Sequence, residues 1–270
     1  MAVIYLSNLD CFMKKLIIVL IVLIAALYHK DAQAQQRQYY ELRTYVLAND
    51  TQQSRVESYL EKSLIPALKR QGIRNIGAFA PIANDTAATR HLYLLIPFDN
   101  IQSIFNYESR LSKDEAYMQN GADYLKAKFD NIPYLRQERV LLHAFKDHPI
   151  IKKPTLKSPR EERVYELRSY EGHTESIFSN KVKMFNEGGE IRIFEKLGFN
   201  AVFYGEALYG HRMPNLIYMT SFENIEARNA QWKRFGDDPD WKKLSSMSEY
   251  QNNVSLINSW LLRSRPYSDL

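Results

Sequence analysis

One hexapeptide occurs twice in this chain and constrains its fold more than any other feature. Residues 40–45 read Tyr-Glu-Leu-Arg-Thr-Tyr, and residues 165–170 repeat them with a single Thr-to-Ser exchange. The apolar run at 92–98 has a counterpart at 216–222, at almost the same spacing. Matches that recur at a nearly constant offset over such a length indicate a duplication. The sequence therefore predicts two copies of one structural unit.

Each copy shows strand-like and helix-like segments in the same order. Residues 38–46 alternate in side-chain character with a period of two, which is typical of a strand. Residues 54–71 place apolar side chains at helical spacing, and Pro66 is expected to kink or split that helix. The remaining first-copy segments are predicted as strands at 75–80, 91–97 and 136–145 and helices at 101–110 and 113–129.

The second copy repeats this order, with strands predicted at 164–170, 201–206 and 216–222. Its long helix, at 175–197, is expected to be interrupted at Gly188 and Gly189. The order β-α-β-β-α-β is that of a ferredoxin-like unit. The predicted organisation is a leader with signal peptide at 1–34, a first unit at 36–146, a linker rich in Pro and Lys at 147–161, and a second unit at 162–270.

The N-terminal residues have the pattern of a secretory signal peptide. Lys14 and Lys15 precede an apolar run at 16–27, and Ala-Gln-Ala at 32–34 provides a small-residue cleavage site. The run is shorter than the roughly 20 apolar residues of a spanning helix. We expect cleavage after Ala34, export to the periplasm or medium, and no transmembrane anchor afterwards.

The only cysteine of the chain, Cys11, lies within this leader. The mature protein would then have no disulfide, no thiol nucleophile and no thiolate metal site. The net charge of +5 is spread among acidic residues, so the sequence predicts an ordinary solvated surface and no nucleic-acid-binding face.

A ferredoxin-like unit covers one face of its sheet with helices and leaves the other face open. We therefore predict an α+β fold in which the sheets of two tandem units pack face to face as an incomplete barrel, forming a pseudo-dimer within one chain. In this arrangement Tyr40 and Leu42 lie under the helices. Six repeated residues point between the sheets instead: Glu41, Arg43, Tyr45, Glu166, Arg168 and Tyr170. The opposite phase is the alternative.

The repeated charges allow two interpretations. Arginines on a shared strand face can bind a carboxylate or phosphate, which predicts a pocket for a small organic or anionic molecule. Alternatively, the charges satisfy one another as cross-sheet ion pairs, because buried charges need partners. Tyr218 and His143 complete the candidate pocket residues, since tyrosine-rich cavities suit organic ligands.

Several common sites have no sequence signal in this chain. No two histidines have metal-binding spacing, and no C-x-x-C-H motif is present, so we predict no metal site and no resident cofactor. Non-covalent haem with His143 or His211 as axial ligand is the alternative. The motifs G-x-S-x-G, P-loop and G-x-G-x-x-G are also absent, so the usual basis for hydrolase, phosphate-binding or dinucleotide-binding functions is lacking.

Taken together, these segments resemble the NIPSNAP family. The resemblance rests on the repeated Tyr-Glu-Leu-Arg opening and, in the second copy, on Gly205-Glu206, the run at 214–219 and the run at 238–242. The first copy departs from it, because it contains no tryptophan and has Thr-Arg-His at 89–91 where the second copy has Met-Pro-Asn.

The resemblance implies the dimeric α/β-barrel fold and no single activity. Related barrel families include haem-degrading and quinone-forming monooxygenases and haem-binding dismutases. Three functions follow as alternatives: a small-molecule binder with its site between the sheets, a cofactor-free or haem-using oxygenase, and a protein-interaction module or homo-oligomer.

Overall fold

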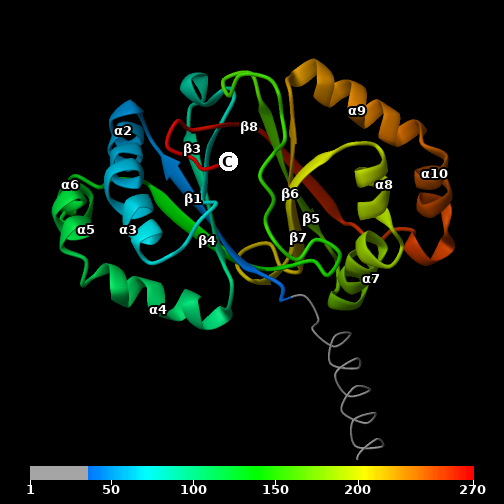
Figure 1. Ribbon diagram of the computed structural model, residues 1–270, viewed down its shortest axis with the longest axis horizontal. Coiled ribbons are helices and arrows are strands. Elements are labelled where there is room, and N and C mark those ends of the chain that lie inside the picture. The colour runs from blue at the N-terminus through cyan, green and yellow to red at the C-terminus, as the bar shows by residue number, and fades with distance from the viewer. Residues whose placement is uncertain (1–35) are drawn as a thin grey trace, which may run out of the picture. The chain divides into compact units, whose positions relative to one another are not determined.

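A computed structural model describes residues 36–270, so the predicted leader and signal peptide lie outside the described residues. Within residues 37–270, eight antiparallel strands close into one barrel. Figure 1 shows the helices of the first copy against one side of the barrel and those of the second copy against the other. Among the described residues, no helix is long and apolar enough to cross a membrane.

The first copy begins at β1 and ends at β4. Its strands are β1 (Tyr39–Leu47), β2 (Gly77–Pro81), β3 (Arg90–Phe98) and β4 (Arg136–Ala144). Its helices are α2 (Asp50–Tyr59), α3 (Ile65–Arg70), α4 (Ile101–Leu111), α5 (Glu115–Asn120) and α6 (Ala122–Leu125), with a 3₁₀ turn at Asn84–Thr86. A π-helical turn, Leu60–Leu64, joins α2 to α3, so the predicted helix is split just before Pro66.

The second copy repeats these elements. Its strands are β5 (Val164–Glu171), β6 (Asn200–Tyr209), β7 (Asn215–Phe222) and β8 (Leu256–Ser264). Its helices are α7 (Glu175–Asn186), α8 (Glu190–Lys196), α9 (Ile225–Asp237) and α10 (Pro239–Ser246), with a 3₁₀ turn at Ser248–Tyr250. Gly189 adopts a left-handed φ of 90° at the break between α7 and α8, where the sequence predicts an interruption.

The strand order around the barrel is β1-β3-β2-β8-β5-β7-β6-β4. Within each copy this is the antiparallel order of a ferredoxin-like sheet, which confirms the predicted fold class. The copies are joined twice, because β2 pairs with β8 and β4 pairs with β6. The expected incomplete barrel is therefore closed, and neither sheet keeps a free edge among these strands.

Three hydrophobic layers follow from this closure. Tyr40, Leu42 and their repeats Tyr165 and Leu167 pack inside the barrel with inward residues of the other strands. A second cluster lies between the first-copy strands and helices α2 to α5. A third, rich in phenylalanine, occupies the same position in the second copy. An eight-stranded barrel has an interior just wide enough to be filled by its own side chains.

The predicted helix at 113–129 is shorter than expected. Gly121 separates α5 from α6, and regular helix ends at Leu125. The segment between β4 and β5 has no helix or strand, as the proline-rich sequence predicts. It follows the barrel closely, because the amide of Lys152 donates to the carbonyl of Val202 at 2.9 Å.

Candidate functional site

The repeated Glu-Arg-Tyr residues lie under the helices and not between the sheets, so the predicted orientation was wrong. Glu41 and Arg43 contact Tyr107 of α4, whereas Tyr40 and Leu42 fill the barrel. The physical reason is the closure of the barrel. Apolar side chains fill the interior around Tyr40 and Leu42, and the helix layer supplies the partners that the charged groups need.

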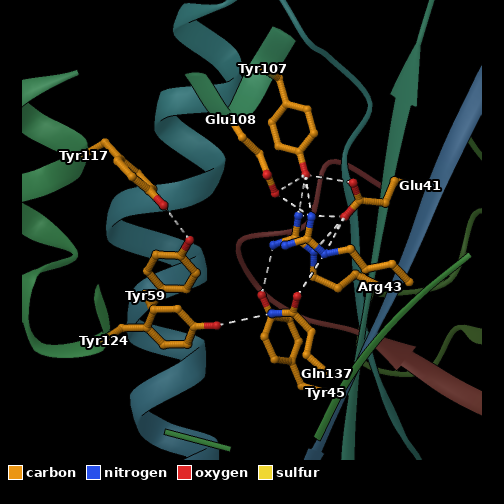
Figure 2. Close-up of polar contacts among 10 residues, drawn as sticks. Glu41, Arg43, Tyr45, Tyr59, Tyr107, Glu108, Tyr117, Tyr124 and Gln137 are labelled. Carbon is orange, nitrogen blue, oxygen red and sulfur yellow. Dashed lines mark hydrogen bonds and ion pairs between the residues drawn. The ribbon is translucent and has the colours of Figure 1, made fainter. Parts of the chain in front are cut away.

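A closed network of hydrogen bonds holds Arg43 in the first copy. Its Nε donates to Glu41 Oε1 at 2.7 Å, and its Nη2 donates to the Tyr107 hydroxyl at 2.8 Å. The same hydroxyl donates to Glu41 Oε2 at 2.7 Å, and Arg43 Nη1 reaches the Tyr45 hydroxyl at 3.2 Å. Figure 2 shows these contacts converging on the guanidinium. Arg43 is therefore a paired, structural cation.

Burial alone would lower the pKa of Arg43, because it disfavours the charged form. Tyr45, Glu41 and Tyr107 around it outweigh that effect and keep the pKa well above the ordinary value. Only 3% of Arg43 is exposed. Arg43 thus stays charged, and its hydrogen bond helps to fix the position of the Tyr107 hydroxyl.

A cavity of about 360 Å³ lies beside this network, between the sheet and the helices of the first copy. We call it the first-copy pocket. Apolar side chains of Leu111, Met118 and Leu125 line part of it, with Ser112 and Gln137. Five tyrosines, two arginines and a glutamate also line it: Tyr59, Tyr107, Tyr117, Tyr124, Tyr134, Arg43, Arg139 and Glu108. Leu64, at the end of the π-helical turn, also lines it, and such turns often occur at functional sites.

The tyrosine side chains of the pocket are ordered by contacts with one another. The rings of Tyr59 and Tyr124 stack with centroids 3.8 Å apart, and the hydroxyls of Tyr59 and Tyr117 lie 2.9 Å apart. Burial raises the pKa of Tyr59, Tyr107, Tyr117 and Tyr124. All four hydroxyls therefore stay protonated, and that of Tyr107 donates its proton to Glu41.

Charged side chains form the rim of the first-copy pocket. Arg139 of β4 donates to Glu108 at 2.5 Å and to Gln137 Oε1 at 2.9 Å. Its side chain is 42% exposed, unlike that of Arg43. The hydrogen bond from Arg139 lowers the pKa of Glu108, so this rim pair is ionised at neutral pH. The pocket thus combines a tyrosine-lined interior with an accessible arginine.

The second copy keeps the charges but adds partners to the glutamate. Glu166 accepts from Arg168 and Arg228 at 2.7 Å each, from Trp232 Nε1 at 2.6 Å and from Ser259 at 2.8 Å. Burial would raise the pKa of Glu166, but the hydrogen bonds from Arg228 and the charge of Arg168 outweigh it. The pKa falls to about 2. Glu166 is thus a fully satisfied structural anion.

Aromatic side chains fill the second-copy space that corresponds to the first-copy pocket. Trp232 stands 125 residues after Tyr107 and donates to the same oxygen of the repeated glutamate. The guanidinium of Arg168 lies 4.6 Å from the Trp232 ring centroid. Phe194 and Phe235 pack against that ring. The duplicated residues therefore border a cavity in the first copy and a packed core in the second.

The other predicted pocket residues lie elsewhere. The Tyr218 hydroxyl lies 2.9 Å from that of Tyr170, and Tyr218 is buried in the second-copy core. His143 stacks on Tyr39 with ring centroids 4.5 Å apart and lies 3.7 Å from Glu206. Of the eight predicted residues, the structure places Arg43 in the lining of the first-copy pocket, with Glu41 and Tyr45 as its hydrogen-bonding partners.

Sequence reasoning missed the tyrosines and Arg139 that line the pocket. One signal was present, because the first copy contains no tryptophan, and Tyr107 makes there the contact that Trp232 makes to the repeated glutamate. The remaining residues come from α2, α5, α6 and β4, and only the fold brings them together.

The lining of the first-copy pocket contains no histidine, so the pocket does not fit haem held by an axial histidine. His143 and His211 lie outside that lining. Among residues 36–270, no group of three or more His, Cys, Asp or Glu side chains is placed to hold a metal ion.

Comparisons with known proteins place the chain on a known fold. A proposed monooxygenase from Lactobacillus acidophilus superposes with a TM-score of 0.55 at 12% identity, covering 84% of this chain and 94% of that one. A proposed monooxygenase from Fusobacterium nucleatum gives a TM-score of 0.53 at 10% identity, covering 85% and 93%. An anthrone oxidase-like protein gives a TM-score of 0.52 at 9% identity, covering 86% of this chain and 93% of that one. A search of curated protein sequences found no match.

At these identities the similarity shows the fold alone, which is the dimeric α/β-barrel type. In this chain both halves of the barrel belong to one polypeptide. The NIPSNAP family model matches residues 165–269, which is the second copy almost from end to end. The resemblance seen in the sequence is thereby confirmed: this chain carries a NIPSNAP domain in its second copy.

Proposed function

We propose that the protein binds a planar aromatic molecule with oxygen substituents, such as a phenol or quinone, in the first-copy pocket. The observation that carries this proposal is the contrast between the copies. The same Glu-Arg-Tyr residues border a tyrosine-lined cavity of about 360 Å³ in one and packed aromatic side chains in the other. In the second copy, large aromatic side chains are enough to fill this space. The first copy keeps a cavity at the same place, which supports a bound molecule there.

The shape and lining of the pocket support a flat ligand. Its volume falls in the range of about 300 to 1,000 Å³ that is typical of small-molecule sites. Tyr59 and Tyr124 are stacked with their planes only 4° apart, so a third ring can add to this stack. Aromatic pairs contribute about 0.5 to 1.5 kcal/mol beyond the burial of their area.

The polar groups of the pocket support oxygen atoms on that ligand. The hydrogen bond between the Tyr59 and Tyr117 hydroxyls uses only one of their two protons, and Arg139 adds a charged donor at the rim. Phenolic, carbonyl and carboxylate oxygens accept from such groups. A hydrogen bond to a charged group contributes about 1.5 to 3 kcal/mol, so a ligand that supplies an acceptor to Arg139 gains affinity over one that does not.

A reaction is not part of this proposal. The similarity to proposed monooxygenases concerns the fold, and folds host many functions. The residues nearest the network are already paired: Arg43 with Glu41, and Arg139 with Glu108.

A three-compound series tests the recognition of planarity and oxygen. Residues 36–270 would be titrated by calorimetry with 2-naphthol, with naphthalene, which lacks the oxygen, and with decahydro-2-naphthol, which lacks planarity. We expect saturable binding of one 2-naphthol per chain and at least roughly tenfold weaker binding of the other two. Equal affinity for all three, or no binding of 2-naphthol, would refute the proposal.

Two serines on one helix turn provide a matched pair of variants for locating the site. Ser112 lines the first-copy pocket and Ser109 does not, yet both are exposed and each donates its hydroxyl to a carbonyl three residues earlier at 2.9 Å. Ser112→Trp should block 2-naphthol, whereas Ser109→Trp should bind it normally. Normal binding by Ser112→Trp would place the ligand elsewhere.

A further inference from the structure

One end of the barrel interior is polar, unlike the rest. On three strands the inward-facing residue changes from apolar to polar toward this end. Leu42 is followed by Thr44 on β1, Val140 by Glu138 on β4, and Leu167 by Ser169 on β5. A cavity of about 190 Å³ opens there, which we call the barrel-mouth cavity. It lies on the inner face of the strands, so it is distinct from the first-copy pocket under the helices.

The floor of the barrel-mouth cavity is apolar. Leu42, Val140, Leu167 and Ile217 come from four different strands, and Trp260 of β8 adds an aromatic wall. Small eight-stranded barrels either fill their interior with side chains or hold one small ligand there. The floor can therefore take a short hydrocarbon chain or ring, but the volume excludes a large one.

A cation with spare hydrogen-bonding capacity lies at the rim. Arg212, in the loop between β6 and β7, approaches Glu171 only to 3.8 Å and lies 5.9 Å from the centroid of Trp260. No described residue accepts a hydrogen bond from it. Its φ of 62° is in the left-handed region, which is uncommon for residues other than glycine and frequent at functional sites.

Two acids stand near the same rim, each with a polar neighbour. Glu138 lies 3.5 Å from His211 Nε2, and Glu171 accepts a hydrogen bond from Asn258 at 3.2 Å. Arg212 is the arginine in the lining of this cavity, and its planar fork matches the two oxygens of a carboxylate.

We propose that the barrel mouth is a second binding site, which takes a small monocarboxylic acid with a short apolar tail. The tail lies against Leu42, Val140 and Ile217, and the carboxylate accepts from Arg212. This site is independent of the aromatic-binding function proposed above.

NMR of the tryptophan indole groups provides a direct test. The chain has three tryptophans, and Trp232 and Trp241 belong to the second-copy core, so they serve as internal references for Trp260. Titration of residues 36–270 with hexanoate should shift the Trp260 indole signal in a saturable manner. Hexylamine, which has the same length and the opposite charge, should not.

Arg212→Asn tests the role of the guanidinium without straining the loop, because Asn tolerates the left-handed region. We expect hexanoate affinity to fall by about tenfold or more, as for loss of a charge-assisted hydrogen bond. Arg110→Asn, at an exposed position on α4, is the control and should bind normally.

Three results would overturn the proposal. They are no Trp260 shift with hexanoate, unchanged affinity in Arg212→Asn, or a stronger response to hexylamine. Ser112→Trp separates the two sites, because it should block 2-naphthol and leave hexanoate binding intact. Loss of hexanoate binding in that variant would assign the acid to the first-copy pocket and refute a second site.

Discussion

Glu166→Gln should destabilise the protein by about 3 kcal/mol at neutral pH, and the loss should depend on pH. The side chain of Glu166 is fully buried, and its pKa falls from 4.5 to about 2. Each pKa unit corresponds to about 1.4 kcal/mol, so the ionised form contributes about 3 kcal/mol. The amide keeps the shape but leaves the partly buried Arg168 and Arg228 without this counter-charge, which is costly.

The sign of the pH dependence follows from the lowered pKa. Because the folded pKa lies below the unfolded one, the contribution is complete above pH 4.5 and is lost as pH falls towards 2. The difference between wild type and Glu166→Gln should therefore shrink to about half at pH 3. Urea unfolding at pH 5.5 and pH 3, followed by tryptophan fluorescence, measures it.

Glu226→Gln is the control for this measurement, because Glu226 is exposed on α9. It should match wild type within about 0.5 kcal/mol at both pH values. The reasoning fails if Glu166→Gln is as stable as wild type at pH 5.5, or if its deficit is the same at both pH values.

Three further predictions concern single residues. Burial lowers the pKa of His148 from 6.5 to about 4. This residue should therefore reduce the free energy of unfolding by about 3 kcal/mol between pH 6.5 and 4. Urea titrations should show that His148→Phe lacks this contribution. The Tyr165 hydroxyl is buried without a partner among the described residues, so Tyr165→Phe should be neutral or stabilising, and a loss above about 1 kcal/mol would contradict this. Trp232→Phe removes the indole donor to Glu166 and should cost about 1 to 3 kcal/mol in urea unfolding. It should leave calorimetric 2-naphthol binding unchanged, because that site belongs to the first copy.

The architecture of each copy could be predicted from the sequence because its signals are local. Alternation along residues 38–46 predicts a strand, and the repeated hexapeptide predicts the same strand in the second copy. Asn100 and Asn224 are N-caps at the start of equivalent helices. The pairing of β2 with β8 and of β4 with β6 has no local signal, since it joins strands from different copies. The closed barrel was therefore missed.

The orientation of β1 could not be predicted because both of its faces are buried. Tyr40 and Leu42 on one face and Tyr45 on the other are large and almost inaccessible, so alternation indicates no solvent side. The barrel interior decides the orientation, because apolar side chains fill it around Tyr40 and Leu42. This orientation of β1 places Glu41 and Arg43 beside the helices. The first-copy pocket therefore lies at a place that the sequence did not indicate.

Tyrosine-ring NMR during titration with 2-naphthol tests the central claim most directly. With ¹³C-labelled tyrosine, we predict shifts at Tyr59, Tyr107, Tyr117, Tyr124 and Tyr134, which line the first-copy pocket. Tyr170 and Tyr218, which are buried in the packed core of the second copy, should not move. Shifts at Tyr170 and Tyr218, or at Tyr40 and Tyr165 inside the barrel, would contradict the account.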